Sequence, residues 1–123
     1  MEFITTQNAP QAIGPYSQAV VVNGMVYTSG QIALTPEGVM LEDDITIQTN
    51  QVLKNLEAVL SAGGSEMNRV VKCNIFLADM DDFAVVNELY EKAFRTHKPV
   101  RSTVAVKTLP KNALVEIDAM SLI

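Results

Sequence analysis

The sequence is poor in cysteine and histidine, the residues on which metal sites and covalent catalysis most often depend. It has one cysteine, Cys73, and one histidine, His97, in 123 residues. A single cysteine excludes an intrachain disulfide, and one residue of each type is too few for a zinc site. A Ser-His-Asp triad would have to use His97, which stands among basic residues where a helix is expected to end. We therefore expect no metal, no cofactor and no triad, and a reducing, cytoplasmic setting.

Long apolar runs and an excess of basic residues are also missing. The longest purely apolar runs, such as residues 19–22, fall far short of the roughly 20 residues of a membrane-spanning helix. The N-terminus lacks the basic-then-apolar pattern of a signal peptide. Fourteen acidic and nine basic residues give a net charge of −5. The only local basic group is Arg95, His97, Lys98 and Arg101, so the composition counts against membrane insertion and nucleic-acid binding.

The composition and length of the chain indicate a globular protein with a hydrophobic core. Hydrophobic residues make up 48% of the sequence and charged residues 19%. This composition is typical of a folded protein, and the length suits one domain, so we expect a single domain over residues 1–123.

Residue patterns predict six strands and two helices. Asn23 and Gly24, between two β-rich runs, predict a type I′ hairpin. The expected strands are residues 2–6, 17–22, 25–32, 69–77, 102–107 and 114–122, with an ordered loop at 8–15. Apolar residues at helical spacing predict one helix over 44–62, capped by Asp43 or Asp44 and ended by Gly63-Gly64, and a second from Phe83 that Pro99 ends.

This order of elements predicts an α+β two-layer sandwich: a mixed six-stranded sheet with both helices on one face. The other face of the sheet would then need a cover, and a homo-oligomer is the simplest one.

Two charged residues stand in β-rich apolar runs near the end of the chain. Arg101 lies within residues 99–104 and Glu116 within 115–117. A guanidinium group binds a carboxylate through two parallel hydrogen bonds. A carboxyl group in apolar surroundings can acquire a pKa that suits proton transfer near neutral pH. Together they suggest a site for a substrate with its own carboxylate, although the residues alone leave open that both charges face water.

Strand alternation adds a prediction about faces. If the apolar faces of the last two strands meet the helices, Arg101, Thr103 and Glu116 lie on the helix-free face. A simple hairpin about Pro110 would hold the two charges about 13 Å apart along the strands. Either the pair is not one site, or these strands are not neighbours, or the site is completed between subunits. The long connection 108–113 favours strands that are not adjacent.

Segments along essentially the whole chain resemble the Rid family, also called YjgF, the reactive imine/enamine deaminases. The matching segments are residues 8–10, 12–18, 29–31, 82–87, 101–104, 109–110 and 115–117. The block from Arg101 to Glu116 is the most specific part, because this Arg and Glu in their apolar frame form the family signature.

The resemblance implies a chorismate-mutase-like homotrimer with sites at the subunit interfaces. It implies hydrolysis of 2-imino acids, formed from enamines such as 2-aminoacrylate, to 2-keto acids and ammonia. Arg101 would bind the substrate carboxylate, Tyr16 would hydrogen-bond ligand or water, and Glu116 would activate the attacking water or protonate the leaving amine. The residues lining the site would be Ser29, Gly30, Asn87 and Thr103, with Gly30 and Thr103 acting mainly through their backbone.

Other interpretations of these residues stay open. Without the resemblance, Tyr16 is equally a half-buried tyrosine and Gly30 a strand bulge. Many relatives have Cys where this chain has Thr103, which a backbone contact would tolerate. A non-catalytic sensor of small 2-keto acids would use the same Arg101, and some relatives have been described as ribonucleases or translation inhibitors.

Overall fold

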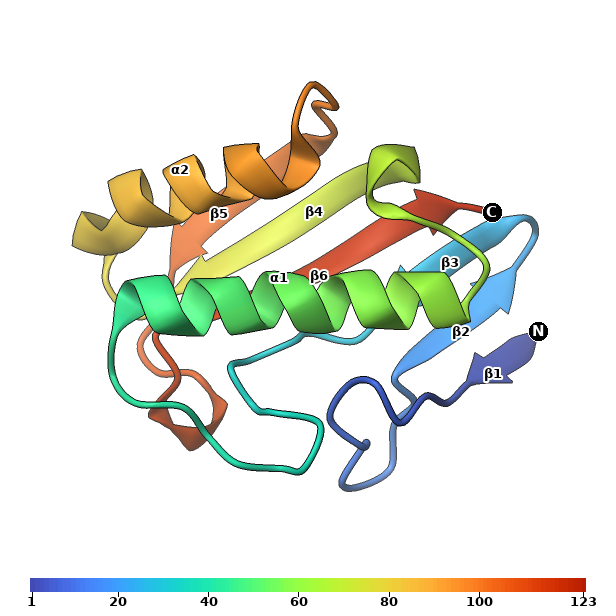
Figure 1. The fold of residues 1–123 in the computed structure, drawn as a ribbon, viewed down its shortest axis with the longest axis horizontal. Helices are drawn as coiled ribbons and strands as arrows, with labels where there is room; N and C mark the ends of the chain where they lie inside the picture. Colours follow the sequence, from blue (N-terminus) through green and yellow to red (C-terminus); the bar gives the residue numbers. More distant parts are fainter.

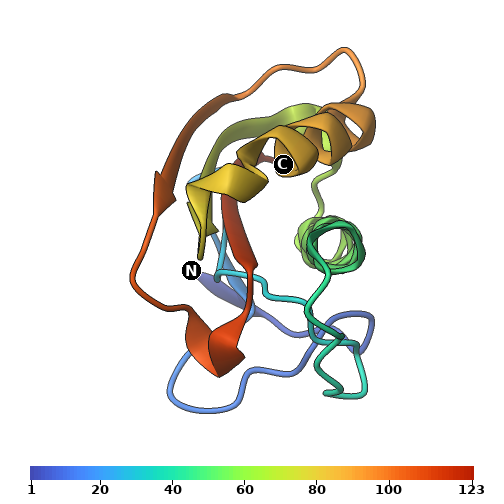
Figure 2. The same ribbon diagram turned by 90° about the vertical axis from the view of Figure 1, so that its left-hand side faces the viewer.

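The computed structural model describes all residues 1–123 and has one six-stranded sheet with two helices against one face (Figures 1 and 2). The strands are β1 (Glu2–Ile4), β2 (Ala19–Val22), β3 (Met25–Thr28), β4 (Val70–Leu77), β5 (Val100–Ala105) and β6 (Val115–Leu122). The helices are α1 (Ile45–Ala62) and α2 (Phe83–Phe94), with short 3-10 turns at η1 (Met67–Arg69), η2 (Met80–Asp82) and η3 (Pro110–Asn112). The predicted α+β sandwich is confirmed.

The sheet order is β1-β2-β3-β6-β4-β5, in which only β4 and β5 pair in parallel. The last strand, β6, therefore lies in the middle of the sheet, and β4 separates it from β5 (Figure 1). This confirms that the last two strands are not hairpin neighbours. The connection 106–114 has to cross from the sheet edge to its centre, which explains its length.

The turn and cap residues of the sequence predicted the β2–β3 turn and both ends of α1 correctly. Asn23 and Gly24 have φ angles of 51° and 75°, the positive values at both central positions that a type I′ turn requires. Asp44, and not Asp43, is the cap of α1, because its Oδ1 accepts the Ile47 N–H at 2.9 Å. Gly63 ends the helix.

The expectation that Pro99 ends the second helix was wrong. The helix ends at Phe94, well before Pro99, because Arg95 takes a left-handed φ of 58° and the apolar helical pattern stops there. His97 does not cap the helix through its ring. The ring Nε2 lies 2.6 Å from the carbonyl of Val70 in β4, and only the His97 backbone N–H donates to Phe94.

The core lies between the sheet and the helices. Its largest fully buried side chains include Leu56 and Leu60 from α1 and Ile75, Leu77 and Ile117 from the sheet. Cys73 is fully buried in this core and faces the helices. Burial raises the pKa of its thiol to about 11, so the thiol stays protonated at neutral pH.

The prediction that Arg101 and Thr103 share the helix-free face with Glu116 was wrong for both β5 residues. Arg101 and Thr103 pair with Cys73 and Ile75, the β4 residues that face the helices. Glu116 alternates with core residues of β6 and does lie on the helix-free face. Arg101 and Glu116 therefore lie on opposite faces of the sheet.

The position of Arg101 and Thr103 on the helix-covered face has a physical reason. As the edge strand beneath α2, β5 turns Arg101 towards the helix, where its side chain packs on aromatic rings. Its valines are turned outward, so that Val100 and Val104 are 64% and 46% exposed on the helix-free face, together with Tyr27 of β3. This face carries apolar side chains that nothing in one chain covers. Neither helix is long and apolar enough to cross a lipid bilayer.

Candidate functional site

The structure sorts the seven predicted site residues into two groups. Tyr16, Ser29, Gly30 and Glu116 line one cavity of about 490 Å³, together with residues such as Gln18 and Lys111. The other three, Asn87, Arg101 and Thr103, lie at the edge of the sheet between β5 and α2 and do not line this cavity. Each chain thus carries two separate half-sites, which we call the carboxyl half-site, with Glu116, and the guanidinium half-site, with Arg101.

In the carboxyl half-site a backbone bridge brings Gly30 against Glu116. Gln31 and Ile117 exchange two backbone hydrogen bonds, of 2.9 and 3.1 Å, which fasten the segment after β3 to β6. A Cβ atom on Gly30 would lie 2.7 Å from Cδ of Glu116, so only glycine leaves room for the carboxyl group. Gly30 therefore marks a close approach and not a strand bulge, and β3 has already ended at Thr28.

A buried glutamine that the sequence interpretation left without a role holds the loop above this cavity. Gln18 is 3% exposed. Its side-chain NH₂ donates to the carbonyls of Thr6 and Pro10 at 3.0 and 2.7 Å, and its Oε1 accepts the Thr6 N–H at 2.7 Å. The signal in the sequence was a polar residue at the point where the loop enters a strand. Gln18 thereby orders the segment that leads to Tyr16.

The two hydroxyl groups of the cavity differ in what they offer. Tyr16 is 54% exposed, so it is not a half-buried core tyrosine, and its Oη accepts the Ile13 N–H at 3.3 Å. Its phenolic hydrogen is left for a ligand or water. The Ser29 hydroxyl donates to the Ser17 carbonyl at 2.5 Å, so towards the cavity it can only accept.

Glu116 has the electrostatics of a proton carrier. Burial raises the pKa of its carboxyl group above the ordinary value, and the negative charge of Asp118 on the same face of β6 raises it further. Asp118 itself accepts a hydrogen bond from Asn74 at 2.8 Å, which holds that charge in place. A carboxyl group shifted in this direction binds and releases a proton closer to neutral pH.

In the guanidinium half-site Arg101 has only uncharged partners. Its Nη2 donates to Oδ1 of Asn87 at 2.5 Å, and its guanidinium carbon lies 4.9 Å from the ring centre of Tyr90 and 5.4 Å from that of Phe83. No carboxylate lies within 4 Å of it, since the only ion pair of the chain joins Lys92 to Glu88. Its charge therefore remains available to an anionic ligand.

Thr103 stands two residues along the same face of β5. Its hydroxyl oxygen is buried and has no hydrogen-bond partner. A buried hydroxyl without a partner is unfavourable. A group from outside the chain would satisfy it.

A substitution of Gly30 tests the packing of the carboxyl half-site. Gly30→Ala is expected to push the Glu116 carboxyl group aside by about an ångström and to lower catalytic turnover more than tenfold. Because the clash is with the end of a flexible side chain and φ at Gly30 is not positive, the thermal midpoint should fall by only a few degrees. Steady-state kinetics and thermal melting check the two effects. Full activity of Gly30→Ala would show that the carboxyl group need not lie there.

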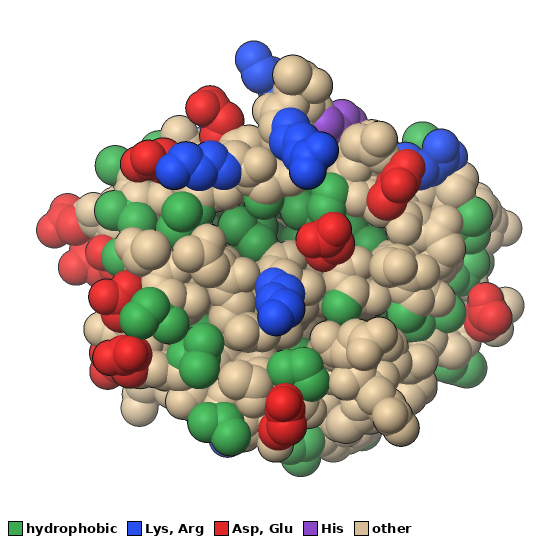
Figure 3. Space-filling view, viewed as in Figure 1, with side chains coloured by type: hydrophobic (Ala, Val, Ile, Leu, Met, Phe, Trp, Pro, Cys, Tyr) green, Lys and Arg blue, Asp and Glu red, His purple; other side chains and the backbone are tan.

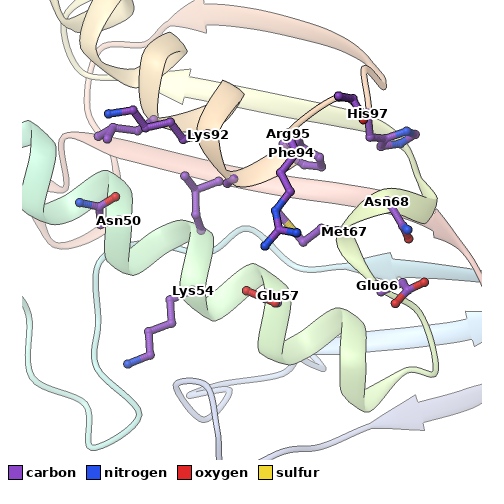
Figure 4. Close-up of a pocket in the computed structure, with 14 residues that line it drawn as sticks. Asn50, Lys54, Glu57, Glu66, Met67, Asn68, Lys92, Phe94, Arg95 and His97 are labelled. Carbon is purple, nitrogen blue, oxygen red and sulfur yellow. The ribbon is translucent and has the colours of Figure 1, made fainter.

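A second hollow, of about 660 Å³, lies between α1 and α2 and contains none of the seven residues. Arg95 reaches into it from the end of α2, above Lys54 and Glu57 of α1 (Figure 4). On the helix-covered face, acidic side chains gather along the left edge, and the basic side chains elsewhere on the face have acidic ones near them (Figure 3). This hollow is therefore neither one of the half-sites nor part of a uniformly basic surface.

Comparison with known proteins agrees with this architecture. The family model described as endoribonuclease L-PSP matches residues 6–123. A chloroplastic protein of Arabidopsis thaliana named Reactive Intermediate Deaminase A is 46% identical over 98% of this chain, which spans 65% of the plant protein.

Solved structures extend the likeness to the whole fold. RidA from the Antarctic bacterium Psychrobacter sp. PAMC 21119 superposes with a TM-score of 0.95 at 41% identity, covering all of both chains. E. coli TdcF with bound serine superposes with a TM-score of 0.95 at 39% identity, covering 100% of this chain and 99% of the other. Because the family model matches residues 6–123 and these relatives are 41–46% identical over nearly the whole chain, the chain belongs to the Rid family, also known as YjgF or L-PSP.

Proposed function

We propose that this protein hydrolyses reactive 2-imino acids, such as the 2-iminopropanoate formed from 2-aminoacrylate, to 2-keto acids and ammonia. The observation that carries the proposal is the uncompensated guanidinium of Arg101, which suits a substrate carboxylate, combined with a cavity-lining carboxyl group of raised pKa. Two relatives support the substrate class: one is named a reactive intermediate deaminase, and another was solved with serine, a small amino acid.

One chain does not bring its two half-sites to a single ligand. Arg101 and Glu116 lie on opposite faces of the sheet, and β4 stands between their strands. We infer that the site forms between copies in a homotrimer, where the guanidinium half-site of one chain meets the carboxyl half-site of the next. The apolar helix-free face, with Val100 and Val104 exposed, supports this assembly, and so does the unpartnered Thr103 hydroxyl.

The proposed mechanism needs no covalent intermediate. Arg101 binds the substrate carboxylate bidentately and so fixes the adjoining imine carbon, with Asn87 and Thr103 beside it. The Glu116 carboxylate takes a proton from a water molecule as the water oxygen attacks that carbon. The resulting tetrahedral carbinolamine carries the oxygen and the nitrogen on one carbon.

Collapse of that intermediate completes the hydrolysis. Protonated Glu116 returns its proton to the nitrogen, which gives the neutral carbinolamine. Glu116 then takes the hydroxyl proton of this intermediate and passes it to the nitrogen as well, the C–N bond breaks, and ammonia leaves as the C=O bond forms. Tyr16 donates its free phenolic hydrogen to the water or the developing oxygen, and Ser29 accepts from the ligand. The balance is one imino acid and one water to one 2-keto acid and one ammonia, with Glu116 restored.

The activity is tested with 2-aminoacrylate generated in the assay, pyruvate release being followed by a coupled dehydrogenase. The wild-type protein is expected to accelerate pyruvate release above the spontaneous rate. Binding of 2-ketobutyrate without acceleration of any imine hydrolysis would instead support a non-catalytic sensor that uses the same residues.

The shared site makes a prediction about mixed oligomers. Arg101→Ala and Glu116→Gln should each keep at most about 1% of the activity alone, whereas unfolding and refolding the two together should restore part of the activity. In a mixed trimer some sites combine Arg101 of one chain with Glu116 of another. Activity measured against the mixing ratio checks this, and sedimentation checks the trimer. A mixture that forms mixed trimers yet stays inactive would show that both groups act from one chain.

The description of the family model raises a second candidate, an RNA-directed activity. The net charge of −5 counts against it. Salt-dependent RNA binding that is lost when Arg95, Lys98 and Arg101 are neutralised would favour it over the deaminase.

A further inference from the structure

Three residues on one stripe of α2 surround the guanidinium of Arg101. Phe83, Asn87 and Tyr90 follow one another at spacings of four and three residues, so they project from the same side of the helix. The two rings lie 5.4 and 4.9 Å from the guanidinium carbon, and the amide oxygen between them accepts a hydrogen bond from Nη2. Phe83 and Tyr90 otherwise look like ordinary apolar positions of an amphipathic helix.

We propose that Phe83 and Tyr90 are positioning residues, which hold Arg101 by cation–π contact so that the site selects ligands carrying a full negative charge. The proposal rests on the proposed function, in which Arg101 binds the substrate carboxylate. The rings act through Arg101 and do not themselves touch the substrate.

Because its partners are uncharged, the Arg101 guanidinium keeps its full positive charge for a ligand. An aspartate or glutamate in the stripe would orient Arg101 equally well, but it would also neutralise it and compete with the ligand. Aromatic faces attract a cation through their quadrupole without cancelling its charge. Asn87 takes one of the five N–H donors, which leaves donors of the fork free for a carboxylate.

Tyr90 is fixed well enough to act as a support. It is 6% exposed, and its ring packs against that of Phe94 at 4.5 Å between centres. The entropy cost of ordering the long arginine side chain is therefore incurred on folding and not on ligand binding, which favours binding. Leu89 lies on the same helix and packs against the core, but it lines the hollow between α1 and α2, which Arg101 does not, so it offers a matched control.

The experiment compares Tyr90→Leu, Tyr90→Phe and Leu89→Ala. Calorimetry with pyruvate and with its uncharged amide, pyruvamide, measures binding, and imine hydrolysis gives KM and kcat separately. Tyr90→Leu is expected to weaken pyruvate binding and raise KM about tenfold, with a small change in kcat and none in pyruvamide binding. Tyr90→Phe keeps the ring and should restore most of the affinity. Leu89→Ala should lower the melting temperature without changing the affinity for pyruvate.

If Tyr90→Leu folds poorly, a substitution of Phe83 tests the same proposal. Phe83 is only partly buried, and Phe83→Leu should raise KM several-fold in the same manner. Equal pyruvate binding in the wild type, Tyr90→Leu and Phe83→Leu would overturn the inference, as would equal weakening by Leu89→Ala. These outcomes are separate from the failure of the proposed function: pyruvate binding that depends on Tyr90, without imine hydrolysis, would keep the inference and reject the deaminase.

Discussion

Replacing Arg101 by alanine is expected to lower kcat/KM for 2-iminopropanoate by about 100- to 1,000-fold. A charge-assisted hydrogen bond to an ion contributes about 1.5–3 kcal/mol, and Arg101 would supply two together with the orientation of the imine carbon. No other cation replaces it, because the guanidinium half-site holds no second basic side chain within the stripe of α2. The coupled assay with freshly generated 2-aminoacrylate measures the loss, and calorimetry with pyruvate should show parallel loss of binding.

Two further variants separate the role of Arg101 from its charge. Arg101→Lys keeps the charge but cannot form the bidentate pair, so we expect it to recover only a small part of the activity. Arg95→Ala removes an exposed arginine of the hollow between the helices and should leave kcat/KM within about twofold of the wild type. Near-wild-type activity of Arg101→Ala would contradict the assignment of the anchor.

Replacing Glu116 by glutamine is expected to lower kcat by about 100- to 10,000-fold, with a small effect on pyruvate affinity. Glutamine keeps the shape of the side chain against Gly30 but cannot carry a proton, and general acid–base catalysis is worth about this much. In the wild type, kcat/KM should rise with pH through the pKa of Glu116. Because this pKa is raised, the rise should lie at higher pH than for an ordinary glutamate.

Asp118 provides the matched control for that pH dependence. Asp118→Asn removes a charge that raises the pKa of Glu116, so the rise in activity should move to lower pH. A profile that does not move would contradict Glu116 as the titrating group.

Stability gives an independent check with a definite sign. A carboxyl group whose folded pKa is raised favours the folded state when protonated, and this contribution is lost as the pH rises through the folded pKa. Glu116→Gln should therefore gain stability relative to the wild type, by thermal melting, as the pH rises from the ordinary glutamate pKa through the raised pKa of Glu116. Loss of activity in this variant then cannot be attributed to unfolding.

The sequence alone determined the elements and the chemistry available to them. Asn23-Gly24 set the hairpin, Asp44 and Gly63 set the limits of α1, and the order of elements implied the sandwich. These features depend on neighbours along the chain, which is why local patterns predict them. The resemblance to the Rid family, carried by motifs along the chain, is confirmed by the matched family model.

The tertiary structure decided which face of the sheet each charged residue occupies. Alternation shows that Arg101 and Thr103 share a face, but not which face, since that depends on what covers each side of an edge strand. The stripe of α2 covers one side of β5 and accepts the arginine, so the valines turn outward. Arg101 and Glu116 were identified from the sequence as a pair. The packing of α2 on β5 and the position of β4 between β5 and β6 separate them within one chain, which the order of residues along the chain does not show.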